Sequence, residues 1–295
     1  MISYQTTERG LESLIERKSP GWTKRAGART TKFRQQGFYR ERGSIWSEVK
    51  PVYMLLQGES KCAFCERKLE SETYGKGEQA VEHFRPKGKV KEWKPRGTFK
   101  NKKIPFAKVP VGNRGYYLLA YHRFNYTAAC NPCNSVLKGS YFPIAGKYAF
   151  RSDDVSSLRK ELPYLIYPIG PLDRPAESVI EFYGVSPRAV AHSGHIRNRA
   201  LVTIEFFRLD DPIGRKNLFR ERAMVIALLY TQLETIAKTD DRAEKEEARK
   251  LVGATTSEKA PHTNCAASFI KLYKSNPAEA KTISNSAMEF ICSTS

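Results

Sequence analysis

Two Cys-x-x-Cys pairs constrain this chain more than any other feature of its sequence. They are Cys62-Ala63-Phe64-Cys65 and Cys130-Asn131-Pro132-Cys133, separated by 64 residues. A spacing of two residues lets both thiolates turn toward one ion, and two such pairs supply the four ligands of a tetrahedral zinc ion. Because four protein ligands leave no open position, this zinc would be structural. The sequence therefore predicts two distant segments that meet around a metal, with a long insertion between them.

Two other interpretations of these cysteines compete with zinc. A redox Cys-x-x-Cys is one, although neither pair stands in the strand-helix-strand pattern of a thioredoxin-like protein. Four unrelated buried cysteines are the other. The two remaining cysteines, Cys265 and Cys292, stand alone, and we expect each to be a small buried apolar residue.

The net charge of the 295 residues is +19, which bears on partners rather than on fold. Eleven Lys or Arg and one acid lie between Phe84 and Arg114, and nine Lys or Arg and one acid between Arg17 and Arg42. Such clusters can neutralise several phosphates. The simplest alternative is a generally basic, soluble surface. We expect a nucleic-acid partner, with DNA favoured over RNA.

Location and domain organisation follow from the remaining pattern. No apolar run approaches the roughly 20 residues needed to span a bilayer, and the first residues are mixed and charged, so we expect a cytoplasmic protein with no membrane partner. Residues 1–60 are interpreted as a helix, a loosely ordered basic arm and a second helix. Residues 61–150 form the core, with a basic insertion over 87–114, and residues 151–295 are mainly helical.

Periodicity places the individual elements within these regions. Pro51 is expected to kink or restart the helix that begins at Ser44. A short strand should end at Val81-Glu82-His83, and a helix should begin near Asn134. The other predicted helices cover 8–17, 196–207, 218–237 and 264–274, and the charged stretch 238–250 is a solvated helix face or a linker.

Polar residues around the cysteine pairs suggest chemistry. Hydrolysis of a phosphodiester needs a base for the attacking water and positive charge on the oxygens of the transition state. Glu82 and Asn134 offer oxygen ligands, which suit Mg²⁺ or Mn²⁺. His83 is a candidate general base, since its ordinary pKa near 6.5 leaves much of it neutral.

Each of these residues could instead have a purely structural role. Glu82 and His83 would point to opposite faces of a continuing strand, so both serve one site only if the strand ends there, and Pro86 fits such an exit. Asn134 could be a plain helix cap, and Asn125 a plain turn residue.

The order of these motifs resembles a known family. Glu82-His83-x-x-Pro86, then Asn125, then Cys130-x-x-Cys133-Asn134 with Lys138 four residues on, is similar to the signature of zinc-bearing HNH nucleases. The residues within these motifs look like those of the HNH subunit of the Septu and retron-associated anti-phage systems, the PtuB-like nucleases. It is strongest over 46–143. The resemblance implies an α+β fold, with a small ββα-metal HNH core and its four-cysteine zinc site embedded in mainly helical N- and C-terminal flanks.

The resemblance also implies roles for single residues. His83 would be the general base, with Asn125 holding its loop, while Glu82 and Asn134 would hold the catalytic Mg²⁺ or Mn²⁺. The residues expected to contact nucleic acid are Arg85, Lys87 and Lys138. An ATPase partner of the ABC type and a part in anti-phage defence are implied as well. The family's Trp-rich approach to the middle Asn is replaced here by 116–124, and the insertion is long for such a core.

Three functional hypotheses follow. The first is a metal-dependent endonuclease acting on DNA. The second is the same chemistry on RNA, for example tRNA. The third is a non-catalytic zinc-bound protein that binds nucleic acid or acts as a scaffold, in which case His83→Ala would leave every activity unchanged.

Overall fold

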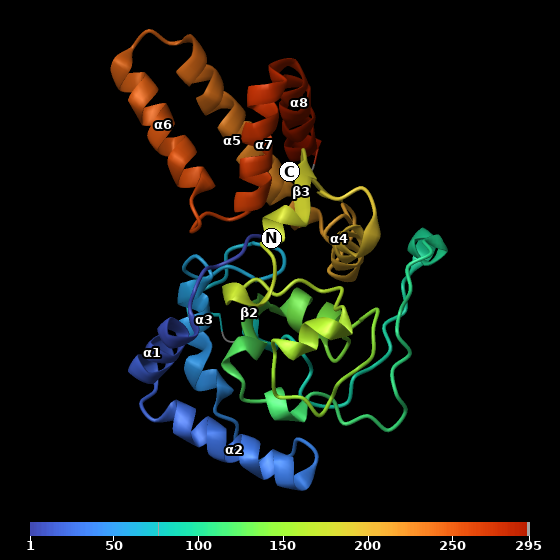
Figure 1. Cartoon of the computed structure of the whole chain (residues 1–295). Coiled ribbons are helices and arrows are strands. Elements are labelled where there is room, and N and C mark those ends of the chain that lie inside the picture. The colour runs from blue at the N-terminus through green and yellow to red at the C-terminus, as the bar shows by residue number, and fades with distance from the viewer. Residues whose placement is uncertain (76, 294–295) are drawn as a thin grey trace.

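The computed structural model describes residues 1–75 and 77–293. Helices dominate, and the described strands form two small antiparallel sheets of two strands each. Figure 1 shows the N-terminal helices and the cysteine-bearing segments in the lower part, and the helices near the C-terminus grouped above them. No described helix has both the length and the apolar character needed to cross a lipid bilayer.

Two helices form the N-terminal region. Helix α1 (Glu8–Lys18) was predicted and begins at Thr7, whose side chain accepts the amide hydrogen of Gly10. Helix α2 (Trp22–Gln36) occupies the stretch that we expected to be a loosely ordered arm, so that prediction was wrong. The reason is a buried face, which carries Trp22, Ala26 and Phe33 among the basic residues.

The segment before the first cysteine pair restarts as predicted. A 3-10 turn (Trp46–Val49) leads into helix α3 (Lys50–Leu56), with Pro51 in the first turn of α3, where its missing N–H costs no hydrogen bond. The chain then reverses at Gly58, which has a φ of 59°. A Cβ there would lie 2.2 Å from the carbonyl oxygen of Glu258, so only glycine fits this close approach.

Strand β1 (Gln79–His83) pairs antiparallel with β2 (Tyr126–Cys130). Their register sets His83 opposite Tyr126 and Glu82 opposite Thr127. A short helix of the π type (Pro132–Lys138) follows β2 directly, and its wider turn shows in the hydrogen bond from the amide of Gly139 to the carbonyl of Asn134. The predicted end of the strand at His83 and the predicted helix near Asn134 are both confirmed.

The C-terminal region contains more than the predicted helices. A hairpin of β3 (Ile180–Tyr183) and β4 (Ser186–Ala189) precedes them, and it was not predicted from the sequence. The final helix, α8 (Pro277–Ser293), was missed as well. The other helices, which match predicted helical stretches or extend the charged stretch, are α4 (Gly194–Phe206), α5 (Lys216–Lys238), α6 (Arg242–Thr256) and α7 (Thr263–Ser275).

The basic insertion, residues 87–114, projects beside α4 in Figure 1 and contains one 3-10 turn (Gly97–Asn101). Aromatic packing holds it in place. Phe99 is buried in a small cluster with Tyr164 and Val202, and Trp93 packs against the same cluster. The base of the insertion is closed by Asn113, whose side chain bonds both the amide and the carbonyl of Val90.

Candidate metal centre and catalytic pocket

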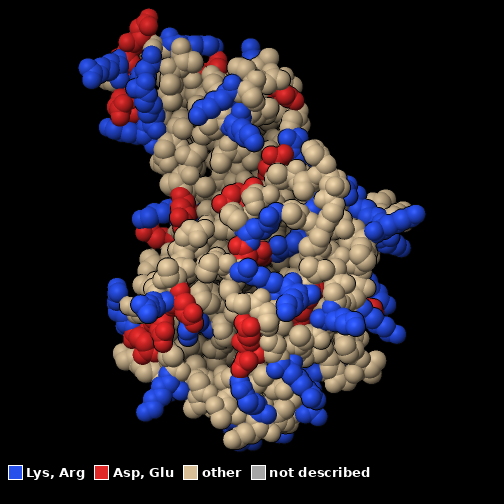
Figure 2. Space-filling model, viewed as in Figure 1, with Lys and Arg blue, Asp and Glu red and all other residues tan. Residues whose placement is uncertain are grey.

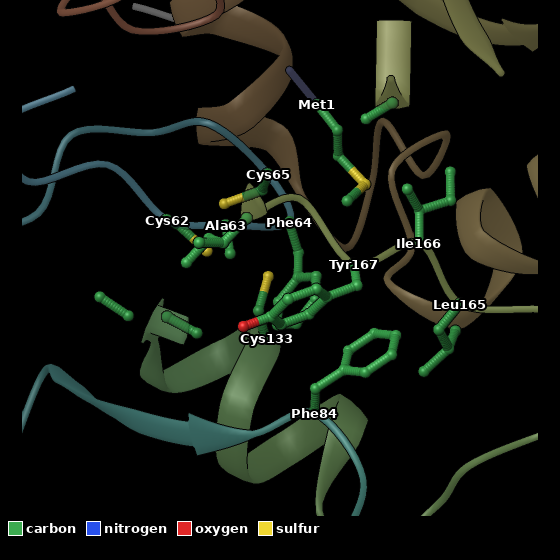
Figure 3. Packing of buried hydrophobic residues seen from close by; sticks show 14 of the residues in the cluster. Met1, Cys62, Ala63, Phe64, Cys65, Phe84, Cys133, Leu165, Ile166 and Tyr167 are labelled. Carbon is green, nitrogen blue, oxygen red and sulfur yellow. The ribbon is translucent and has the colours of Figure 1, made fainter. Parts of the chain in front are cut away.

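The four cysteines of the two pairs meet in the fold. Their sulfur atoms all lie within 4.8 Å of one another, and all four side chains are buried. The sulfurs of Cys65 and Cys130 are 3.8 Å apart, which is about the edge of a regular tetrahedron with Zn–S bonds near 2.3 Å. Figure 3 shows Cys62, Cys65 and Cys133 converging beside the ring of Phe64. The cluster could therefore hold a metal ion such as zinc.

Hydrogen bonds from Gln57 bring the two cysteine segments together. Its side-chain nitrogen donates to the carbonyls of Lys61 and Ala128, and its side-chain oxygen accepts the amide hydrogen of Ala128. The amide of Cys130 also donates to the sulfur of Cys62 across 3.4 Å. These contacts fix the first pair against strand β2, so the four sulfurs are held in place by the fold itself.

Arg215, just before α5, adds positive charge to the cluster. Its guanidinium lies 3.7 Å from the sulfur of Cys133, where it can offset the charge of thiolates. Nothing in the sequence pointed to this residue, because it stands far along the chain from either pair. Of the two remaining cysteines, Cys265 is buried as expected, whereas Cys292 is exposed, which corrects that prediction.

A cavity of about 490 Å³ is lined in part by the residues that directly follow Cys133. Glu82 and His83 at the end of β1 both line it, since the strand stops there instead of continuing in alternation. Asn134, one residue after the last cysteine, lines the same cavity and is half-buried. Its remaining lining residues are Tyr39, Val81, Pro86, Lys87, Gly88, Lys89, Ser135, Gly139 and Ser140.

The hydrogen bond of His83 decides which of its ring nitrogens is free. Nε2 lies 3.1 Å from the carbonyl oxygen of Ala120. A carbonyl can only accept, so Nε2 carries the hydrogen, and in the neutral ring Nδ1 is left with its lone pair. Nδ1 lies 3.5 Å from the ammonium of Lys87, which is a long and weak contact. The nitrogen able to take a proton is thus on the side of the lysine that lines the cavity.

Aromatic rings clamp His83. Trp46 and Tyr126 both stand edge-on to its ring, with centroids 5.0 Å away. Burial lowers the pKa of His83 well below its usual range, and the positive charge of Lys87 acts in the same direction. The imidazole is therefore fixed in position and neutral. Sequence periodicity marked Trp46 only as a core residue of its helix, so its contact with the histidine was missed.

Asn125 holds the loop after His83. Its side-chain oxygen accepts the amide hydrogen of Arg85, and its side-chain nitrogen donates to the carbonyls of Arg85 and Leu119. The side chain is 1% exposed, so these bonds have no competition from water. Asn125 does not line the cavity, and its geometry is that of a residue that positions the loop.

The structure places Lys138 differently from the expectation that it contacts a phosphate. Its ammonium is fully buried and lies 3.0 Å from Oε1 of Glu82. Burial raises the pKa of Glu82 and lowers the pKa of Lys138, while the opposite charge of each partner counteracts that effect. Lys138 therefore neutralises Glu82 from inside the fold, and of the three predicted phosphate contacts only Lys87 lines the cavity.

Arg85 is the second correction. It is 7% exposed, and its guanidinium pairs with Glu161 at 3.2 Å and donates to the carbonyl of Leu158. It also lies 5.0 Å from the ring centroid of Phe142. Arg85 does not line the cavity that holds Glu82 and His83, and its guanidinium is engaged inside the fold, as expected of a structural residue.

We expect Arg85→Ala to lower the free energy of unfolding by about 3–5 kcal/mol, because Glu161 would be left buried without its partner. Nucleic-acid binding by the folded fraction should keep its dependence on salt. Chemical denaturation and a salt titration of binding check the two parts. A variant of normal stability with a reduced salt dependence would contradict this assignment.

Comparison of the chain with protein-family models, curated proteins and solved structures gave no match. The function has to be argued from the site itself. The features that bear on it are a four-cysteine cluster and an adjoining cavity, where a carboxylate, a neutral imidazole, an ammonium and an amide meet.

Proposed function

We propose that this protein is a metal-dependent endonuclease of the HNH class, acting on DNA. The observation that carries the proposal is the state of His83: Nε2 is committed to the carbonyl of Ala120, and Nδ1 is left as the proton acceptor. A neutral, immobilised imidazole at the edge of a polar cavity is suited to take a proton from water. The succession of β1, β2 and the helix Pro132–Lys138 around that cavity also fits a ββα-metal core.

The oxygen donors at the cavity fit a catalytic ion. Glu82 and Asn134 both line it, and carboxylate and amide oxygens suit Mg²⁺ or Mn²⁺. Lys138 engages Oε1 of Glu82 from inside the fold. When bound there, the ion would supply positive charge to the oxygens of the reacting phosphate.

The remaining catalytic and binding roles are assigned to side chains of the protein. His83 takes the proton of the attacking water at Nδ1, and Asn125 keeps the loop that follows His83 in register. Lys87 lies over the ring of Trp46 at 4.3 Å and lines the cavity, so its ammonium is placed to bind the phosphate under attack. Tyr39, whose ring also lies beside Lys87, completes the wall.

The surface charge supports a polyanionic substrate. In Figure 2 blue side chains are dense around the projection that Figure 1 assigns to the insertion, where only one acidic residue, Glu92, falls between Phe84 and Arg114. The same surface would attract RNA, so RNA is the second candidate substrate. A partner ATPase of the ABC type and a role in anti-phage defence are parts of the proposal that rest on the resemblance of the motifs alone.

The test is cleavage of supercoiled plasmid DNA and of total RNA in one buffer. We expect Mg²⁺ or Mn²⁺ to support plasmid cleavage, and EDTA to abolish it while the cysteine-bound zinc is retained. Zinc content is measured in each sample. Restoring Mg²⁺ after EDTA should restore cleavage.

Two results would contradict the proposal in different ways. Cleavage that persists in EDTA would remove the divalent ion from the mechanism. Cleavage of RNA alone would keep the chemistry and transfer it to the second substrate.

A further inference from the structure

A second cavity of about 560 Å³ carries arginine side chains from three separate parts of the chain. Arg34 comes from α2, Arg114 from the end of the basic insertion, and Arg151 from the segment after the core. All three are exposed. The other lining residues are Gly37, Gly112, Asn113, Tyr117 and Phe150. We call this cavity the arginine groove.

The arginine groove adjoins the candidate catalytic pocket. Gly115 follows Arg114 and packs so closely on Gly88 that a Cβ on Gly115 would lie 1.8 Å from the carbonyl oxygen of Gly88. Gly88 lines the catalytic pocket. On the other side, Gly37 of the groove is two residues from Tyr39 of the pocket. The two cavities therefore lie close together, although no lining residue is common to both.

Most of the positive charge in the groove is not neutralised by ion pairs. Arg34 is paired with Asp153. Arg114 lies over the ring of Phe38 at 5.3 Å and donates only to the carbonyl of Gly37, at 3.5 Å. Among the described residues, neither Arg114 nor Arg151 has an acidic partner within an ion-pair distance. A guanidinium in this state is a good donor to phosphate oxygens, because its planar fork matches two of them at once.

The lining fits a polynucleotide chain. Because Gly115, next to Arg114, packs on Gly88 of the pocket, a strand whose phosphate is held by Lys87 can run on toward Arg114. Phe150 also lines the groove, and its ring packs on Tyr116 and Tyr148, which supports the wall beside Arg151. A small anion would need only one of these features.

We propose that the arginine groove binds backbone phosphates of the DNA strand that enters the catalytic pocket, with Arg114 and Arg151 as the contacting residues. The inference rests on the proposed function, because it names a second contact with the same substrate.

The experiment measures binding and not cleavage. His83→Ala protein in EDTA is titrated with a short fluorescein-labelled DNA duplex at several salt concentrations. The double variant Arg114→Glu/Arg151→Glu is compared with Arg242→Glu/Lys250→Glu, which makes the same charge change on α6. Each lost phosphate contact should reduce the slope of log affinity against log salt by about 0.9. The groove variant loses two such contacts, so its affinity should be roughly sixty-fold weaker than that of the unchanged groove at about 0.1 M salt. The α6 variant should lose much less affinity.

A conservative pair guards against misfolding. Arg114→Lys/Arg151→Lys keeps both charges, so it should keep most of the affinity and of the slope. Equal losses in the groove and α6 variants, or no loss in either, would overturn the inference. The outcomes also separate the two proposals. If the wild type cleaves DNA with a metal ion but the groove variant binds DNA normally, only the role of the arginine groove is rejected. If the groove variant binds weakly but the wild type does not cleave, only the nuclease proposal is rejected.

Discussion

Replacing Cys133 with serine is expected to remove zinc from the protein and to unfold the turn that carries Asn134. Four thiolates hold about one zinc ion per chain in such a site, and binding of structural zinc contributes on the order of 10 kcal/mol in small zinc domains. That is comparable with the whole stability of a typical domain, about 5–15 kcal/mol. The cluster also ties the segment after α3 to the end of β2, so its loss should separate these two segments.

Cys265→Ser is the matched control, because Cys265 is equally buried but lies outside the cluster. Zinc content and thermal unfolding are measured for both variants. The Cys133 variant should lose its zinc and melt at a much lower temperature. The control should keep its zinc, and its melting temperature should fall only by the small amount expected when a polar hydroxyl is buried in a core. Equal zinc in the two variants would show that the four sulfurs do not hold the ion.

Cleavage of DNA is expected to fall by about two to four orders of magnitude when His83 is replaced by alanine, which is the usual contribution of a general base. Binding of the duplex should change little, since His83 is 6% exposed and Lys87 remains. Because the substitution leaves a space between Trp46 and Tyr126, added imidazole should restore part of the activity. The measurements are the rate at saturating metal and the affinity for DNA in EDTA.

His122→Ala is the control for this prediction. His122 belongs to the segment before β2, and its ring accepts the amide hydrogen of Phe124 instead of lining the pocket. Similar loss of cleavage in both histidine variants would point to a general effect on the fold. Full cleavage by the His83 variant would remove His83 from the mechanism.

Local spacing in the sequence was enough to predict part of the site. The cysteine pairs predicted their own convergence, because two residues between cysteines already orient both sulfurs. The end of β1 at His83 was predicted from the local pattern, and Pro86 fits it, since a proline close behind a strand residue interrupts the pairing. Both predictions depend on neighbours only a few residues away.

Partners distant in the sequence explain what was missed. Arg85 and Lys138 were assigned to phosphate because they are basic and stand beside the motif, but their acidic partners, Glu161 and Glu82, lie far from them along the chain. Helix α2 was missed because its charged face hides a buried one. The hairpin of β3 and β4 was missed because its strands have only four residues each, too few for a clear alternation.

The short π-helix Pro132–Lys138 carries Cys133 of the four-cysteine cluster and the proposed ligand Asn134. It also carries Lys138, whose ammonium neutralises Glu82. Such widened turns are common where function is concentrated. The candidate metal centre and the proposed active site would therefore depend on the same seven residues. An inhibitor that extracts the proposed zinc would inactivate the proposed nuclease without entering its pocket. Inhibition by a chelator can therefore be interpreted only when the zinc that remains bound has been measured.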